Sequence, residues 1–258
     1  MTAVYAVSDI HGHVDVLLET LVETGLVDAA GHWAGRDARL WFLGDYVDRG
    51  PDGVAVLDLV RRLVDESDGA VGALLGNHEI LAMGMWLFGH QVVPHDGGRA
   101  RSFQRSWTVC GGQRADQEGL TDDHLAWLRS LPVVARDGDF LLMHSDTLAY
   151  LDWGNSPGKI NETAASMMRG TEIASWWELW RRMTSRHAFR SDEGPAAARG
   201  LLDALGGSVI VHGHSIAAEL AEVPYVDVTE PLSYADDLVL AIDGGIYEGG
   251  PCLLTRLA

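Results

Sequence analysis

Polar side chains that can bind metal ions follow apolar segments at several points of the chain. Four such clusters follow candidate strands: Asp9-Ile10-His11, Gly44-Asp45-Tyr46-Val47-Asp48-Arg49-Gly50, Gly76-Asn77-His78-Glu79 and His212-Gly213-His214. A fifth, Met143-His144-Ser145-Asp146, follows one strand of a predicted hairpin. Because residues i and i+2 of an extended segment point the same way, Asp9 and His11 are expected to face one ion while Ile10 turns to the core.

The residue types in these clusters indicate which metals they would hold. Carboxylate, imidazole and amide groups without a thiolate suit manganese, iron or zinc and argue against a structural Cys-rich zinc site. Six such groups fit two ions better than one. Two ions about 3.5–4 Å apart activate a bound water and hold the attacking and departing oxygens of a phosphate ester. The clusters therefore predict a dinuclear centre for phosphate ester hydrolysis.

Alternating strand, loop and helix patterns in the first third of the chain would position these clusters. Apolar runs at Val4–Val7, Leu40–Leu43 and Ala70–Leu75 predict strands. After each strand and its polar loop, apolar residues recur at helical spacing. Such units predict an α/β fold whose loops gather at the carboxyl ends of the strands, where ligands usually bind.

The second half of the chain predicts further elements of the same domain, taken as residues 1–258. Asp137-Gly138 is a strong hairpin signal, and from there the sheet is expected to turn antiparallel. Residues 88–118 show little periodicity and are interpreted as a lid or substrate-shaping excursion. The predicted helices are 121–131, Thr171–Met183 and Pro195–Leu205, and the predicted strands are Val133–Ala135, Phe140–Met143, Ser208–Val211, Val226–Val228, Leu238–Ile242 and Cys252–Leu257.

The composition limits the possible classes of protein. The 258 residues are 47% apolar, which argues against intrinsic disorder and a disulfide-stapled mini-protein. The formal charge is 19 − 37 = −18, which disfavours nucleic acid as a partner. Two cysteines in unrelated surroundings, no basic leader and no apolar stretch near about 18 residues predict a cytoplasmic protein without a membrane partner.

These motifs resemble those of the phosphoprotein phosphatase family of calcineurin-like metallophosphoesterases, in its bacterial type. That family carries, in order, Gly-Asp-x-His, Gly-Asp-x-x-Asp-Arg-Gly, Gly-Asn-His-Glu, a later His after a strand, and Gly-His. The corresponding residues here are 9–11, 44–50, 76–79, 144 and 213–214, so the resemblance spans residues 3–245. It implies an α/β sandwich of two mixed β-sheets flanked by helices, and a phosphomonoester hydrolase like the protein Ser/Thr phosphatases.

The resemblance also implies a metal ligand set. The ligands would be Asp9 and His11 for the first ion, Asp45 bridging both ions, and Asn77, His144 and His214 for the second. The ions would be two divalent metals, with Mn²⁺ favoured over Fe or Zn, and a hydroxide that bridges them would attack the phosphate in line.

By the same resemblance, His78 would be the general acid, with Asp48 orienting its imidazole and favouring its charged form. Arg49 would hold phosphate oxygens through its guanidinium. A second phosphate-binding arginine is expected on the Leu179-Trp180-Arg181-Arg182 segment, with Arg182 preferred over Arg181.

Three departures from the family pattern bear on the substrate. Ser8 stands where the family often has Gly, and Ser145-Asp146 stands where Ala-Gly or Gly-Gly is usual. Residue 216 is Ile, so the Gly-His-x-His ending of the cyclic-nucleotide and nuclease branches is absent, which favours phosphomonoesters over phosphodiesters.

Several alternatives stay open at this point. The same motifs support a dinucleoside polyphosphate hydrolase, in which residues 88–118 would hold a nucleotide, and a metal-binding module without turnover is a third possibility. The substrate is either a phosphorylated protein or a small phosphorylated molecule. His212 competes with His214 as a ligand, Asp243 is interpreted as structural support, and the tryptophans at 176–180 form either core or a substrate platform.

Overall fold

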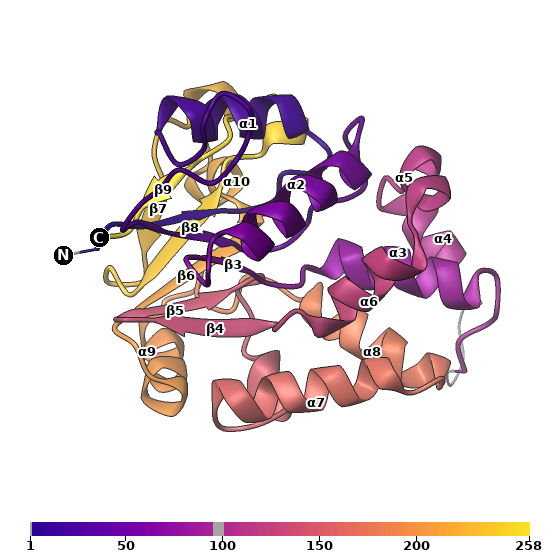
Figure 1. The fold of residues 1–258 in the computed structure, drawn as a ribbon. Coiled ribbons are helices and arrows are strands. Elements are labelled where there is room, and N and C mark those ends of the chain that lie inside the picture. The colour runs from indigo at the N-terminus through magenta and orange to yellow at the C-terminus, as the bar shows by residue number, and fades with distance from the viewer. Residues whose placement is uncertain (1, 95–100) are drawn as a thin grey trace.

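Two β-sheets stack against each other in the computed structural model, which describes residues 2–94 and 101–258 (Figure 1). The first sheet has the order β3-β2-β1-β9, and the second has the order β4-β5-β6-β8-β7. The strands are β1 Val4–Val7, β2 Arg39–Phe42, β3 Val71–Ala73, β4 Val134–Asp137, β5 Phe140–Met143, β6 Val209–Ile216, β7 Leu232–Tyr234, β8 Val239–Asp243 and β9 Thr255–Arg256. The two mixed sheets flanked by helices confirm the predicted fold class.

Apolar side chains from both sheets form a small core between them. This core contains Ala6, Leu43, Leu74, Leu142, Val211 and Ile242, all fully buried. The strands that supply them are flanked on their outer faces by the larger apolar core under the helices. Both faces of the inner strands are therefore covered, which explains why their sequences are continuous apolar runs without alternation.

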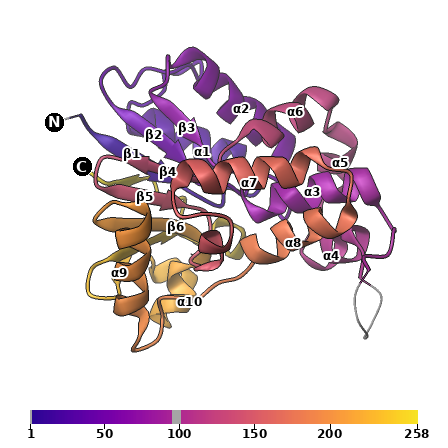
Figure 2. The same ribbon diagram turned by 90° about the horizontal axis from the view of Figure 1, so that it is seen from below.

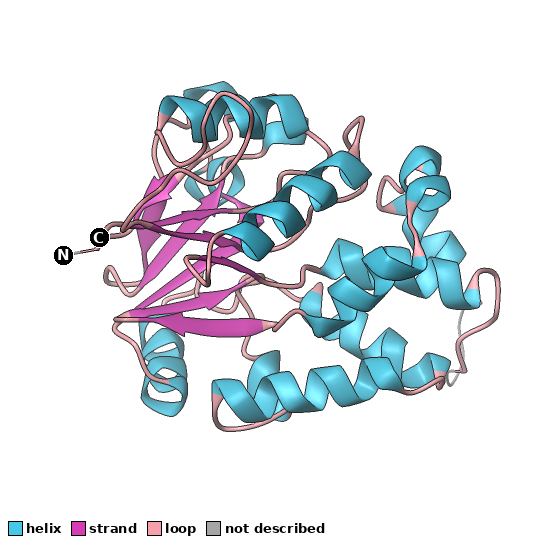
Figure 3. Ribbon diagram, viewed as in Figure 1, coloured by secondary structure: helices cyan, strands magenta, loops and turns pink. Residues whose placement is uncertain are grey.

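Helices cover the outer faces of the sheets and gather at one end of the molecule (Figure 3). Helices α1 and α2 lie over one side, α7 and α9 lie on the other, and α3 to α6 with α8 form the end (Figures 1 and 2). Their bounds are α1 Val14–Glu23, α2 Gly53–Glu66, α3 Asn77–Phe88, α4 Phe103–Val109, α5 Arg114–Gly119, α6 Asp122–Ser130, α7 Pro157–Arg169, α8 Ile173–Met183, α9 Gly194–Leu205 and α10 Ala217–Ala221, with short 3₁₀ turns at Ala149–Asp152, Tyr225–Asp227 and Ile246–Glu248. None of the helices in the described ranges has the length and apolar character to cross a membrane.

The hairpin and the strand ends differ in part from the sequence prediction. The hairpin is confirmed, with Asp137 paired to Phe140. The expected antiparallel pairing holds for the edge strands β4 and β7, but it is wrong for β5, β6 and β8, which run parallel. The predicted strand Val226–Val228 overlaps a 3₁₀ turn instead, because it follows Pro224 and leaves Val226 75% exposed. The last predicted strand shortens to β9, which pairs antiparallel with β1.

Residues 88–118 contain more regular structure than their sequence indicates. Helix α4 begins after Ser102, whose side chain accepts a hydrogen bond from the Arg105 amide, and α5 follows after a short turn. Both helices are short, so they offer too few turns for a detectable helical period. The central part of this segment, residues 95–100, lies outside the described residues, and the role of the segment as a lid stays a prediction.

Candidate metal centre and active site

The polar clusters converge at the carboxyl edge shared by both sheets. Asp9 follows β1, Asp45 follows β2, and Asn77 is the first residue of α3 after β3. From the second sheet, His144 follows β5 and His214 lies near the end of β6. All of these side chains are at most 5% exposed. The sequence thus predicted the meeting point of five segments that are far apart along the chain.

The ligand atoms lie close enough to share cations. Donor atoms of Asp9, Asp45, His144 and His214 lie within 4.8 Å of one another, and so do those of His11, Asp45 and His78. The two groups share Asp45, whose Oδ2 lies 3.5 Å from His11 Nε2 and whose Oδ1 lies 3.4 Å from His144 Nε2. Asn77 Oδ1 lies 2.8 Å from His144 Nε2. This arrangement has the form of two adjacent sites that share one carboxylate.

Two unsatisfied atoms at the centre fit a metal ion. His11 Nε2 and Asp45 Oδ2 are buried and have no hydrogen-bond partner among the described residues. Buried polar atoms are normally paired, so a missing partner at such a point indicates a bound species. Imidazole and carboxylate donors of this kind bind divalent cations, and the cluster therefore fits a divalent metal centre.

Backbone carbonyls orient the three imidazoles. His11 Nδ1 donates to the Val47 carbonyl and His144 Nδ1 to the Leu43 carbonyl, both at 2.9 Å. His214 uses the other nitrogen, since its Nε2 lies 3.1 Å from the Thr184 carbonyl. The nitrogen that is not bonded to a carbonyl is Nε2 in His11 and His144 but Nδ1 in His214.

Burial also favours the neutral imidazoles that a cation requires. Burial and the neighbouring His78 hold the pKa of His11 well below its usual value. Burial and His144 do the same for the pKa of His214. Burial and the Asp9 carboxylate raise the pKa of Asp45 well above its usual value, because two close carboxylates repel each other without a cation between them. The neutral imidazoles and the close carboxylates of the centre therefore favour the binding of a cation.

The backbone at the site is strained, and this corrects the expectation for the first motif. Six site residues have a left-handed backbone: Asp9 (φ 52°), His11 (φ 44°), Asp45 (φ 58°), Asp48 (φ 67°), Arg49 (φ 64°) and His214 (φ 64°). Asp9 and His11 lie in a turn after β1 and are not extended, so strand alternation was the wrong reason for their convergence. Left-handed conformations of residues other than Gly are costly and collect at functional sites.

Glu79 supports the metal-facing loops, and sequence reasoning gave it no role. Its buried carboxylate accepts hydrogen bonds from the amides of Asp45, Tyr46 and Gly76 at 2.7–2.9 Å. A Cβ at Gly76 would lie 2.3 Å from Asp45, so only Gly allows the two loops to approach this closely. Glu79 follows His78 directly in the third motif, and this position in the sequence could have indicated a role at the site.

Asp48 and His78 form a buried pair beside the centre. Asp48 Oδ2 lies 2.9 Å from His78 Nδ1, and Asp48 Oδ1 accepts hydrogen bonds from Trp107 Nε1 at 2.9 Å and from the Gln113 amide at 3.2 Å. Burial raises the pKa of Asp48 to about 7, against the effect of these two donors. Burial and the charge of Arg49 hold the pKa of His78 well below its usual value, whereas Asp48 orients the ring through Nδ1.

Arg49 lies at the entrance to the centre, on an aromatic support that the sequence did not reveal. Its guanidinium carbon lies 4.1 Å from the ring centroid of Tyr247, whose ring also meets His11 edge to face at 5.0 Å. Asp243 accepts a hydrogen bond from the Gly245 amide at 2.8 Å and so fixes the turn before Tyr247, as structural support would. No motif precedes Tyr247, so only the fold reveals it.

The segment after α8 carries Arg186, a further arginine besides the one preferred in the sequence. The Arg182 guanidinium pairs with Glu178 at 2.5 Å and with Asp152. Burial is the main reason why the pKa values of His78 and His214 are low, and the charge of the Arg186 guanidinium lowers both further. The phosphate-binding role of Arg182 stays a prediction, and its two carboxylate partners weigh against it.

Asp146 fixes the segment that carries Arg186. Its carboxylate accepts hydrogen bonds from the His187 amide at 2.8 Å and from Ser215 Oγ at 2.6 Å, and its carbonyl accepts one from the Ala188 amide at 3.0 Å. The unusual segment after His144 thus positions the loop beside the metal centre, where it was expected to influence substrate fit.

Two further sequence features find a structural explanation. Both ring nitrogens of His212 are occupied, one by the Gly213 carbonyl at 2.7 Å and one by the Tyr234 hydroxyl at 2.8 Å. His214 therefore has the free nitrogen of the two. Ile216 is buried in an apolar cluster with Ala217 and Leu253, so its side chain belongs to the core.

Comparison with known proteins agrees with this site. The family model of the calcineurin-like phosphoesterases matches residues 2–217, and the chain belongs to this family of metallophosphoesterases. It is similar to a symmetrical bis(5'-nucleosyl)-tetraphosphatase of Aromatoleum aromaticum, with 31% identity over 66% of this chain and 50% of the relative. A protein of the same name from Acidovorax sp. is 37% identical over 57% of this chain and 44% of the relative. The match spans about half the length of these relatives.

Solved structures show the same fold. A cold-active protein-tyrosine phosphatase of Shewanella sp. superimposes with a TM-score of 0.71 and 22% identity, covering 97% of this chain and 73% of that one. A putative diadenosine tetraphosphatase superimposes with a TM-score of 0.52 and 16% identity, covering 99% of this chain and 93% of that one. At these identities the likeness concerns the fold alone.

Proposed function

We propose that the chain is a metal-dependent hydrolase of dinucleoside polyphosphates, the alternative that the sequence left open. The observation that carries the chemistry is the buried group of Asp9, Asp45, His144 and His214 beside the Asp48–His78 pair. The substrate class is suggested by relatives named symmetrical bis(5'-nucleosyl)-tetraphosphatases. The free thiols of Cys110 and Cys252 agree with a reducing, cytoplasmic setting.

The proposed centre holds two divalent ions, most simply Mn²⁺. The proposed ligands are Asp9 and His11 for one ion, Asn77, His144 and His214 for the other, and Asp45 for both. When bound, the ions would activate water and withdraw charge from the phosphate oxygens. The unpaired Nε2 of His11 and Oδ2 of Asp45 support this assignment.

The chain's own residues would position and protonate the substrate. Arg49 and Arg186 would hold phosphate oxygens and stabilise the charge that develops on them. In the reaction, the oxygen of water bonds to one of the two inner phosphorus atoms, and the bond from that atom to the oxygen shared by the two inner phosphorus atoms breaks, which leaves two molecules of ADP. His78 Nε2 would give its proton to the departing oxygen, with Asp48 holding the ring at Nδ1.

A phosphomonoester, including a phosphorylated protein, is the second candidate substrate. Ile216 favours it, because this buried side chain replaces the second His of the phosphodiesterase branches. The two candidates use the same ligands and differ in what extends from the reacting phosphate. A metal-binding module without turnover is the third possibility, and any metal-dependent hydrolysis excludes it.

The test is a comparison of diadenosine tetraphosphate, a phosphopeptide and an aryl phosphomonoester, each with chelated and with manganese-loaded protein. We expect manganese-dependent cleavage of the tetraphosphate into two molecules of ADP, measured by chromatography of the nucleotides. Turnover of the two monoesters without cleavage of the tetraphosphate would replace the proposal by the second candidate. Silence on all three with manganese bound would favour the non-catalytic module.

A further inference from the structure

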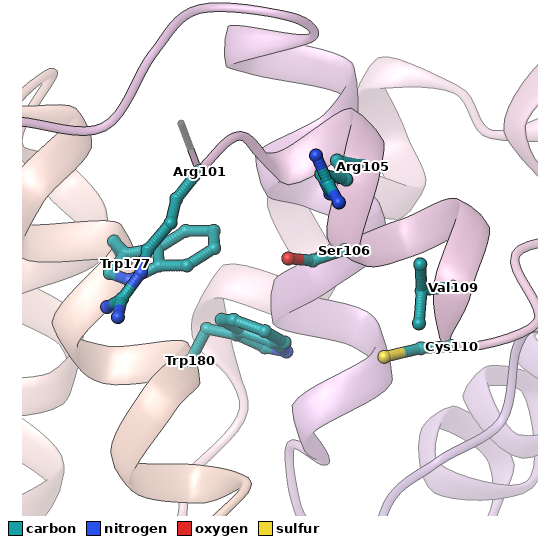
Figure 4. A pocket seen from close by; sticks show the side chains of 7 residues that line it. All are labelled: Arg101, Arg105, Ser106, Val109, Cys110, Trp177 and Trp180. Carbon is teal, nitrogen blue, oxygen red and sulfur yellow. The ribbon is translucent and has the colours of Figure 1, made fainter. Parts of the chain in front are cut away.

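A pocket of about 490 Å³ opens between α4 and α8, outside the metal centre. It is lined by Arg101, Arg105, Ser106, Val109, Cys110, Trp177 and Trp180 (Figure 4). Small-molecule sites typically have volumes of about 300–1,000 Å³ with mostly apolar walls and a few polar groups. The pocket has the size and lining of a ligand site, and the proposed chemistry does not use it.

One wall of the pocket is aromatic. Trp177 and Trp180 lie with their ring centroids 4.7 Å apart, and Phe103 contacts the ring of Trp177 edge to face at 5.3 Å. The Nε1 of Trp180 is buried and has no hydrogen-bond partner among the described residues. Flat rings of this kind stack on nucleobases.

Two arginines line the pocket as well, and among the described residues neither pairs with a carboxylate. Arg114, Arg181, Arg182 and Arg190 all form ion pairs with carboxylates. In the described part of the chain, Arg101 and Arg105 form none, and both are exposed. In a protein of net charge −18, two unpaired guanidinium groups beside aromatic rings form a local site for an anion.

The pocket adjoins the proposed phosphate site. Cys110 and Val109 line this pocket and also the neighbouring hollow formed by Arg49, Gly111 and Tyr247. The Arg49 amide donates to the Gly111 carbonyl at 2.8 Å, so the end of α4 is tied directly to the residue that faces the centre. A substrate with its phosphate on Arg49 can therefore extend along α4 into the pocket.

We propose that this pocket holds one nucleoside arm of the dinucleoside polyphosphate, and this inference rests on the proposed function. The base would stack on Trp180 and Trp177, and Arg101 and Arg105 would bind phosphate oxygens between that nucleoside and the cleaved bond. The pocket would thereby select long nucleotide substrates over small phosphomonoesters.

The first test replaces both arginines by alanine and measures KM with diadenosine tetraphosphate and with a small aryl phosphate. We expect KM for diadenosine tetraphosphate, divided by KM for the aryl phosphate, to rise about tenfold, because only the nucleotide reaches the pocket. Arg114→Ala is the matched control, since it removes an exposed arginine that pairs with Glu118 outside the pocket. An unchanged ratio in the double variant would overturn the proposal.

The second test concerns the aromatic wall and does not depend on turnover. Binding of ADP to chelated protein is measured by calorimetry for wild type, Trp180→Phe and Trp180→Leu. Stacking predicts near-normal affinity with Phe and about tenfold weaker binding with Leu. Equal affinity for all three, or no ADP binding to wild type, would overturn the pocket assignment.

The two proposals can fail separately. If diadenosine tetraphosphate is cleaved but the pocket variants have no effect, the proposed function stands and the assignment of the pocket as a nucleoside site is wrong. Absence of that cleavage with intact hydrolysis of monoesters would remove the proposed function, and the pocket proposal with it.

Discussion

At the scale of single residues, the site depends on which atom of each side chain is left free. Carbonyl oxygens of Leu43, Val47 and Thr184 occupy one nitrogen of each imidazole, so the other nitrogen must face the centre. This arrangement fixes both tautomer and ring orientation before any ion binds. The residue types at the site can be read from the sequence, but only the fold shows that His214 presents the opposite nitrogen from His11 and His144.

Replacement of Asp45 tests the shared ligand. Asp45→Asn keeps the shape of the side chain but removes the charge between the two ligand groups. We expect loss of bound manganese, measured by elemental analysis, and a fall in turnover of at least about 100-fold. Because burial and Asp9 raise the pKa of Asp45, the chelated variant should be no less stable than chelated wild type. Full manganese content with normal turnover would contradict the assignment of Asp45.

Trp107 provides a test of the Asp48–His78 pair through pH dependence. Its indole N–H favours the ionised form of Asp48 and so lowers a pKa that burial raises to about 7. Trp107→Phe removes this donor, and the pKa of Asp48 should rise further. As the pH falls, Asp48 would then become protonated at a higher pH and would no longer orient His78 as a carboxylate. The acid limb of the kcat/KM profile should therefore move to higher pH by about one unit.

The control for this prediction is Trp33→Phe, a similar change in the loop between α1 and β2. Its acid limb should coincide with that of wild type. If the Trp107 variant also leaves the limb in place, the limb does not report on Asp48.

At the scale of elements, the sequence predicted the site residues that come directly after a strand. The strands before Asp9, Asp45 and Asn77 and the hairpin before His144 were found from apolar runs and turn residues. Arg186 and Tyr247 were missed because neither lies in a motif that ends a strand. Their positions depend on long-range contacts, such as the hydrogen bond from the His187 amide to Asp146, and local patterns do not contain this information.

The loop after α8 gives a prediction at this scale. Arg186→Ala should raise KM for the phosphate substrate about tenfold, because a charge close to His78 and His214 is removed. Arg182→Ala is the matched comparison and should leave KM unchanged, since Arg182 already pairs with Glu178 and Asp152. Steady-state kinetics measure both KM values. An increased KM for Arg182→Ala with an unchanged KM for Arg186→Ala would support Arg182, the arginine preferred from the sequence.

A second prediction for this loop concerns Asp146, which holds the segment that carries Arg186 in place. Asp146→Ala leaves the His187 amide and the Ser215 hydroxyl without their acceptor, at a cost of about 1–3 kcal/mol in the free energy of unfolding. It should also reproduce the KM increase of the Arg186 variant while manganese content is retained. Thermal unfolding and kinetics on the same preparation separate the two effects. A lower stability with an unchanged KM would show that the loop does not depend on Asp146.

At the scale of the whole molecule, the centre joins the two sheets. Asp9, Asp45 and Asn77 follow strands of the first sheet, whereas His144 and His214 come from the second. Between the sheets lies the small apolar core around Leu142 and Val211. Carboxylates that repel each other in the absence of a cation also face one another at this junction. Metal binding should therefore stabilise the fold as a unit as well as enable the chemistry.

Removal of metal tests this coupling. A ligand that binds only the folded state, present at 100 times its Kd, stabilises it by about 2.7 kcal/mol. For a chain of this size, that corresponds to a rise in Tm of about 5–10 °C. We expect manganese to produce such a rise over chelated protein in calorimetry, and Asp45→Asn to lose most of it. Metal-free buffer with chelator is the baseline for both proteins. If wild type and the variant gained equally, the ion would be stabilising the protein from somewhere other than the junction of the sheets.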